Sequence, residues 1–315
     1  MRLLYTLAPF SQPSSRSPSI SMPCKRLFHW LCTPSLAPVS GIFIHLTNIT
    51  RASYQGVISV LSGEIQTAAH YTSIASRLLM AAGAHAISST ESSNLRQHLR
   101  SLFWFCYTLD KDLTLRTGEP HCLRDDDCNL DLPPRYEENL HQCLDYSPGA
   151  AATDISGPIF PCDIRLSMIK SRTFTVLYSR NALHKSDVDL LRSVRELDEE
   201  LECWRTSIPE HLRPQLCFSS RESKTKSTFM VLTHMSYYCC VNLIHLAGSR
   251  CSAWRSKSPQ VPGMIDGLQS SLAISVEASR SLLLYLEDSK TRVDASSFWY
   301  TNGPPKSHLY LHLDS

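Results

Sequence analysis

In this chain of 315 residues, no two cysteines are separated by two residues, the C-x-x-C spacing of most small zinc sites. Its 12 cysteines are instead scattered, so the commonest metal-binding spacings do not occur. Some of them, such as Cys106 and Cys240, fall on apolar stripes of expected helices. We therefore expect reduced thiols that pack as small hydrophobic side chains, in preference to disulfides.

The local sequences that mark common enzymes are also missing. There is no Gly-x-Ser-x-Gly, His-Glu-x-x-His, phosphate-binding Gly-Lys-Ser or Gly-x-Gly-x-x-Gly motif, and the chain has only 11 glycines for loop-borne catalysis. Cysteine–histidine catalysis stays open, because it depends on spatial pairing that a sequence does not show. No local sequence favours one such pair, so we predict no catalytic residues.

Two spacings resemble metal ligands, and both fail on inspection. Asp125-x-Asp127-x-Asn129 begins like a calcium loop, but Leu130 stands where the loop needs glycine and Tyr136 where it needs glutamate. His308-x-x-x-His312 lies in a short tail without obvious further ligands. We expect a solvated acidic loop in the first case and coincidence in the second, so no metal or cofactor is predicted in this chain.

Acidic residues are absent from residues 1–63, which are basic and rich in serine. That composition resembles a mitochondrial transit peptide, but there is no clean arginine-bearing amphipathic helix, and six prolines lie between Pro9 and Pro38. We expect an irregular, low-complexity leader over residues 1–55, a helical domain over residues 56–290 and an irregular tail over residues 291–315.

The remaining composition is that of a folded protein, with 43% hydrophobic and 19% charged residues and a formal net charge of +2. A domain that held DNA mainly through its own surface would usually be far more basic. The stretch Phe229–Ala247 is the most apolar, but histidine, serine and asparagine interrupt it. It fits a buried core helix better than a membrane span.

Apolar residues spaced three and four apart predict a series of helices, and no comparable segment alternates with period two. Ser186-Asp187-Val188-Asp189 is a variant of the capping box, which places a helix start there. We therefore predict an all-α, bundle-like fold. The expected helices are Ile65–Ala82, Leu95–Leu113, Ile164–Leu183, Ser186 to the stop at Pro209, Phe229–Ala247 and about Ile265–Leu286, with polar loops at Glu119–Tyr136 and Tyr146–Pro161.

One stretch carries a recognisable pattern of residue types at fixed spacing. We call its eleven residues the signature: Arg96, Arg100, Phe103, Trp104, Tyr107, Asp110, Gly118, Pro120, Asp127, Asp131 and Pro133. It resembles the fungal-specific transcription factor domain, the middle homology region of fungal zinc-cluster regulators. Looser similarity continues through Val194–Leu201 and Glu277–Leu282, so the resemblance covers about Gly56 to Glu287.

The resemblance implies a nuclear, all-helical regulatory domain that controls transcription, with a homodimer and a small-molecule effector as further expectations and no membrane. Family members contact DNA through an N-terminal six-cysteine cluster that binds two zinc ions. Cys24 and Cys32 cannot supply it, and a short polar tail replaces the helices expected beyond Phe298-Trp299. DNA contact is therefore expected to be indirect, through a zinc cluster that this chain lacks. The alternative is a helical scaffold or ligand-sensing protein that binds no DNA directly.

From the residues alone, we expect the signature to serve packing rather than ligand contact. Phe103, Trp104 and Tyr107 would fill a helix interface with their large apolar surfaces. Arg100 would pair with Asp110, Asp127 or Asp131 and so fasten the acidic loop to the helix.

Overall fold

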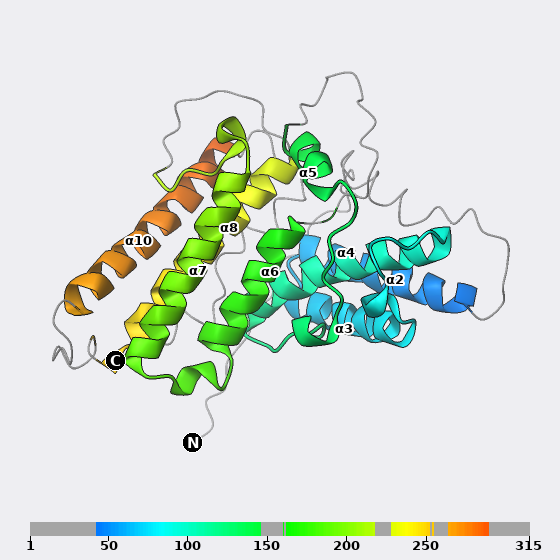
Figure 1. Cartoon of the computed structure of the whole chain (residues 1–315), viewed down its shortest axis with the longest axis horizontal. Coiled ribbons are helices and arrows are strands. Elements are labelled where there is room, and N and C mark those ends of the chain that lie inside the picture. The colour runs from blue at the N-terminus through cyan, green and yellow to red at the C-terminus, as the bar shows by residue number, and fades with distance from the viewer. Residues whose placement is uncertain are drawn as a thin grey trace, which may run out of the picture.

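The computed structural model describes residues 42–145, 160, 162–217, 228–252, 254 and 264–289, and in these residues it contains helices and no strands (Figure 1). The predicted all-α fold is therefore confirmed. The first group of helices comprises α2 (Ile42–Leu61), α3 (Ile65–Ala81) and α4 (Asn94–Thr117). The second comprises α6 (Ile164–Thr173), α7 (Asp187–Ser207), α8 (Thr228–Leu246) and α10 (Met264–Ser289), and the short helix α5 (Tyr136–Asp145) lies between the groups in the chain.

Two pairs of long antiparallel neighbours and one central helix organise the bundle. α2 packs on α3, and α8 packs on α10, while α4 contacts both α3 and α6 and so joins the two groups (Figure 1). One large hydrophobic core extends through both groups, from Leu46 in α2 to Tyr285 in α10. The bundle is thus a single packed body around α4.

Helix α4 is buried along almost its whole length. Every residue from Leu102 to Leu115 is buried, and so are Leu99 and Arg100, including the polar and charged side chains. A helix with an apolar stripe usually leaves its polar residues in water. The polar residues of α4 instead pack against the acidic loop (residues 119–135) and α6.

Helix ends follow the local chemistry that the sequence indicated. Ser186 is the N-cap of α7, and its side chain accepts a hydrogen bond from the Asp189 amide. Gly118 ends α4 in the left-handed conformation at φ +75°, where a side chain would be strained. Gly83 does the same after α3, at φ +71°.

The structure differs from the sequence prediction at the start of the domain and at α5. The expected leader boundary at residue 55 lies inside α2, whose inward residues Leu46, Ile49, Ser53, Gly56 and Val60 repeat every three or four positions. Helix α5 was not predicted, although its buried face also has helical spacing. The tail at 291–315, the leader before residue 42 and most of the loop at 146–161 lie outside the described residues.

The helix expected over Ile164–Leu183 ends ten residues early. α6 stops at Thr173 and continues as a π-helical turn, Phe174–Tyr178, after which Ser179 is extended. The turn contains the adjacent β-branched residues Thr175 and Val176, and β-branched side chains weaken a regular helix. Leu183 therefore lies on the surface, 58% exposed, and not on a helical apolar face.

In the part of the chain that the structure describes, one helical stretch, Phe229–Arg250, has the length and apolar composition of a membrane span, and 67% of its most apolar part is buried inside the protein. That burial explains its composition, because α8 contacts α5, α6, α7 and α10. Cys106 and Cys240 are fully buried, as predicted for thiols that pack as hydrophobic side chains.

Candidate functional site

The aromatic residues of the signature form a cluster of edge-to-face and tilted rings on α4. Phe103, Trp104 and Tyr107 are fully buried, and their ring centroids lie 5.1–5.9 Å apart. The Arg100 guanidinium lies 4.6 Å from the Trp104 ring centroid and 4.8 Å from that of Phe103. Burial lowers the pKa of Arg100 to about 10, so it stays charged at neutral pH.

Arg100 also fastens the acidic loop, but by a different bond from the one expected. Its Nη2 donates to the main-chain carbonyl of Asn129 at 2.7 Å and to that of Asp131 at 3.1 Å. The predicted ion pair with an aspartate is thus replaced by hydrogen bonds to the backbone. The side chain of Asp131 is exposed and bonds to Asn129.

Asp110 holds the start of the same loop. Its carboxylate accepts hydrogen bonds from the amides of Cys122 and Leu123 at 3.0 and 3.2 Å, and Lys111 lies 3.3 Å away. Lys111 is fully buried and donates to the Leu123 carbonyl. Two backbone amides and one ammonium therefore satisfy a buried carboxylate.

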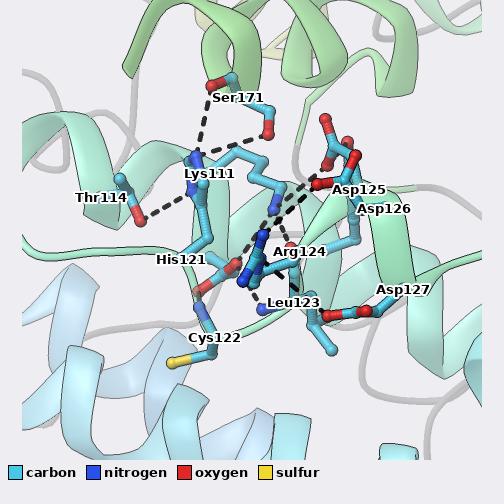
Figure 2. A network of polar contacts seen from close by, with 12 residues as sticks. Lys111, Thr114, His121, Cys122, Leu123, Arg124, Asp125, Asp126, Asp127 and Ser171 are labelled. Atoms are coloured by element: carbon cyan, nitrogen blue, oxygen red, sulfur yellow. Dashed lines mark hydrogen bonds and ion pairs between the residues drawn. The ribbon is translucent and has the colours of Figure 1, made fainter. Parts of the chain in front are cut away.

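Figure 2 shows how the loop closes around Lys111. The ammonium also lies 3.5 Å from Asp125, the residue whose carboxylate accepts a hydrogen bond from the Tyr107 hydroxyl at 2.9 Å. Burial raises the pKa of Tyr107 far above its ordinary value, and the neighbouring Asp125 carboxylate raises it further. The tyrosine is therefore a permanent donor.

The remaining signature residues lie at the margins of this network. Arg96 is exposed and pairs with Glu91 at 2.7 Å, and Asp127 is exposed on the loop. Pro120 is exposed beside Gly118, and the Pro133 carbonyl accepts a hydrogen bond from the Tyr136 amide at the start of α5. The signature thus forms a helix with its acidic loop fastened at both ends.

A second buried charge cluster lies on the other side of α4, and the sequence did not predict it. Lys170 on α6 donates to Asp112 at 2.8 Å and to Ser236 on α8 at 3.0 Å, while Arg116 binds Asp112 at 2.7 Å. Burial alone would raise the pKa of Asp112, but Arg116 and Lys170 lower it well below its usual range. The only available signal was the i, i+4 spacing of Asp112 and Arg116.

Asp163 forms a third polar centre, at the N-cap of α6. It is fully buried, and its carboxylate accepts from the Tyr136 hydroxyl at 2.9 Å, the Arg165 amide at 2.9 Å and the Trp204 indole at 2.7 Å. The Arg165 guanidinium lies 3.4 Å from the same group. One side chain thereby connects α5, α6 and α7.

A pocket of about 360 Å³ opens beside the signature, between α3, α4 and the first residues of the acidic loop. Its lining repeats every three or four residues on each helix, because one face of α3 meets one face of α4. The lining residues are Gln66, Ala69, His70, Thr72 and Ser73 of α3, Asp110, Leu113, Thr114 and Thr117 of α4, and Glu119, Pro120 and Cys122 of the loop. Pro120 and Asp110 are therefore the signature residues that reach the pocket.

This lining includes a cysteine, a histidine and two carboxylates, the residue types of a hydrolytic site. The chemistry of Cys122 does not match such a site, since burial and the neighbouring Asp110 carboxylate together raise the pKa of its thiol to about 12. A nucleophilic cysteine needs a lowered pKa. Asp110 is occupied by its three donors. The arrangement is suited to binding and does not activate a nucleophile.

In the part of the chain that the structure describes, no cluster of histidine, cysteine or carboxylate side chains has the arrangement of a metal site. Cys24, Cys32, His308 and His312 lie outside the described residues.

Comparison with known protein families gives one match that spans this whole region. The model of the fungal specific transcription factor domain matches residues 46–206, which reach from near the start of α2 to the last turn of α7 and contain all signature residues. No solved structure matches the chain.

Several curated relatives are transcriptional regulators. An ABC-transporter-regulating transcription factor of Aspergillus oryzae is 35% identical over 162 residues, which is 50% of this chain and 17% of the relative. The protein of the same description from Aspergillus fumigatus is 34% identical over 162 residues, which is again 50% of this chain and 17% of the relative. An uncharacterized transcriptional regulatory protein of Schizosaccharomyces pombe is 27% identical over 144 residues, 46% of this chain and 18% of the relative. The matched segment thus spans about a sixth of the length of these relatives.

Proposed function

Because this chain belongs to the family of the fungal specific transcription factor domain, we propose that it works in the nucleus as the module that sets the activity of a transcription factor. The family match over half the chain carries this proposal, together with relatives that are themselves transcriptional regulators. Residues 42–289 are proposed to be the regulatory body, extending the expected domain of 56–290 toward the N-terminus.

DNA contact is proposed to come from a zinc cluster in the complete protein. The formal net charge of +2 supports this division of labour, because a surface that neutralises many phosphates needs a larger excess of lysine and arginine. A homodimer remains a prediction from the resemblance.

The module is proposed to be non-catalytic. The pKa of the thiol is raised by burial at Cys106, Cys122 and Cys128, so these groups stay protonated at neutral pH. The buried carboxylates Asp110, Asp112 and Asp163 are each engaged by cations or backbone amides, which suits packing.

Regulation would then be a population shift between two packings of the bundle. The acidic loop is the element we propose to change, because it contacts α4 through Arg100 and Asp110 and reaches α6 through His121, whose Nε2 lies 3.2 Å from the Ser171 carbonyl. A partner that moves the loop would thereby alter the contact between the two helix groups.

A reporter assay tests this function. The full chain would be inserted between a heterologous DNA-binding domain and an activation domain in yeast, with a flexible linker of equal length as the reference. We expect the wild-type insert to change reporter output at least severalfold, and Arg100→Met, which frees the loop, to reduce that change. Glu196→Gln, on the exposed face of α7, is the matched control and should behave as wild type. Equal output for insert and linker at equal protein level would refute the proposal.

A further inference from the structure

We propose that the pocket between α3 and α4 binds a small organic cation that carries several N–H donors, such as a diamine. This deepens the proposed function by naming an effector class, and it rests on that function only for its consequence in the cell. Binding itself is a property of the isolated chain.

The first reason is the charge of the lining. It contains the carboxylates of Asp110 and Glu119, and no lysine or arginine is among the described residues that line the pocket. The nearby ammonium of Lys111 is fully buried and shared between Asp110 and Asp125, at 3.3 and 3.5 Å. Glu119 at the exposed rim is in no described ion pair, so the pocket has an excess of negative charge that favours a cation.

The second reason is the direction of the hydroxyl protons. The Ser73 hydroxyl donates to the His70 carbonyl at 2.7 Å, and the Thr117 hydroxyl donates to the Leu113 carbonyl at 2.9 Å. A hydroxyl has one proton, so both groups can offer a ligand only lone pairs.

A third hydroxyl, that of Thr114, donates its proton to His121. Burial lowers the pKa of His121 to about 4, so its ring is neutral at neutral pH and carries one N–H. Its Nε2 lies 3.2 Å from the Ser171 carbonyl and 3.4 Å from the Ser171 hydroxyl. The carbonyl is the nearer group and can only accept, which places the proton on Nε2. Nδ1 is then an acceptor, and the Thr114 hydroxyl at 3.1 Å must donate to it. Figure 2 shows these two contacts of His121.

Acceptors outnumber fixed donors around the pocket, since two carboxylates and three of the four lining hydroxyls offer lone pairs. The fourth hydroxyl, on the buried Thr72, has no hydrogen-bond partner among the described residues and can turn to donate or to accept. A ligand made of acceptors, such as a carboxylate or phosphate, would leave these lone pairs unpaired and meet like charge. A positively charged ligand with several N–H donors would pair with these lone pairs and would be attracted by the negative charge. The pocket volume of about 360 Å³ is at the small end for ligand sites, so the ligand should be small. Leu113, Ala69 and Pro120 supply apolar wall for a short methylene chain.

The pocket also touches the element proposed to transmit regulation. Glu119, Pro120 and Cys122 belong to the acidic loop, and Thr114 contacts His121, which reaches α6. A bound cation at the rim would therefore hold the loop against α3.

Calorimetric titration of the full chain with 1,4-diaminobutane, butane-1,4-diol and succinate tests the site. These molecules share a four-carbon length and differ in charge and donors. We expect saturable binding of one diamine per chain that weakens as salt is raised, and no measurable binding of the diol or succinate. No diamine binding, or equal binding of the diol, would overturn the proposal.

Two variants locate the binding. Glu119→Gln removes an exposed charge and should raise the dissociation constant of the diamine by about two- to fivefold. Glu196→Gln on α7 should leave that dissociation constant unchanged. Ala69→Leu narrows the pocket and should abolish binding while the circular-dichroism spectrum stays wild type. Unchanged affinity in both Glu119→Gln and Ala69→Leu would place the diamine elsewhere and refute the site. Diamine binding without any effect in the reporter assay would instead count against the proposed function alone.

Discussion

Replacing Asp163 by asparagine tests the claim that buried carboxylates join the helices of this bundle. The substitution keeps size and shape but turns one oxygen into an NH₂ group. The remaining oxygen can still accept from the Arg165 amide and the Tyr136 hydroxyl, as an N-cap asparagine does. The new NH₂ group would then face the Trp204 indole N–H and the Arg165 guanidinium, which are both donors.

The cost follows from those two mismatches. Loss of a hydrogen bond to a charged acceptor costs about 1.5–3 kcal/mol, and a buried indole N–H left without an acceptor costs about 1–3 kcal/mol. We expect Asp163→Asn to lower the free energy of unfolding by about 3–5 kcal/mol, a large share of the stability of an ordinary domain. The midpoint of thermal unfolding should fall by about 6–20 °C.

Urea unfolding of the full chain, followed by far-ultraviolet circular dichroism, measures this change. A double-mutant cycle with Trp204→Phe isolates the indole contribution, because phenylalanine has no N–H to leave unpaired. The double variant should be more stable, by about 1–3 kcal/mol, than the sum of the two single costs predicts. Asp126→Asn, at an exposed carboxylate of the acidic loop, is the matched control and should stay within about 0.5 kcal/mol of wild type. A cost for Asp163→Asn as small as that of the control, or strictly additive costs in the cycle, would refute the reasoning.

Three further changes test other parts of the structure. Gly118→Ala should lower the free energy of unfolding in urea by about 1 kcal/mol, because φ is +75° at that position. Gly267→Ala, in open space on α10, is the control and should be neutral or slightly stabilising. Equal effects of the two substitutions would contradict the assignment of strain to Gly118. Burial lowers the pKa of His121 to about 4 from an ordinary value near 6.5, so the unfolded chain binds this proton more readily than the folded chain. The stabilisation from the neutral, buried ring is therefore complete above pH 6.5 and is lost as the pH falls toward 4. His121→Gln should make the free energy of unfolding less dependent on pH across that range. Lys170→Met removes a buried partner of Asp112 and should cost about 3–5 kcal/mol in the same assay, and a variant as stable as wild type would show that the pair contributes little.

The sequence by itself determined the fold class and most of the helices. Period-3.6 stripes and chemically specific ends, such as the Ser186 cap and the Gly118 stop, depend on residues close together in the chain, and local physics is enough to predict them. Helices α2 and α5 have the same three- and four-residue spacing of buried residues. Helix α2 was not predicted because it follows a serine-rich, basic segment, and α5 was not predicted because it is short.

The tertiary structure alone decided where the charges go. Asp110, Lys111 and Asp112 are charged residues of the kind that usually stay in water, and only packing of α4 against the acidic loop and α6 buries them. Asp112 accepts a hydrogen bond from Lys170, which is 58 residues away in the chain, and Asp163 accepts one from Trp204, which is 41 residues away. A buried ion pair forms only where two distant segments of the chain pack together, and its charges lose their water only through that packing. A local sequence pattern therefore does not contain the information needed to predict it.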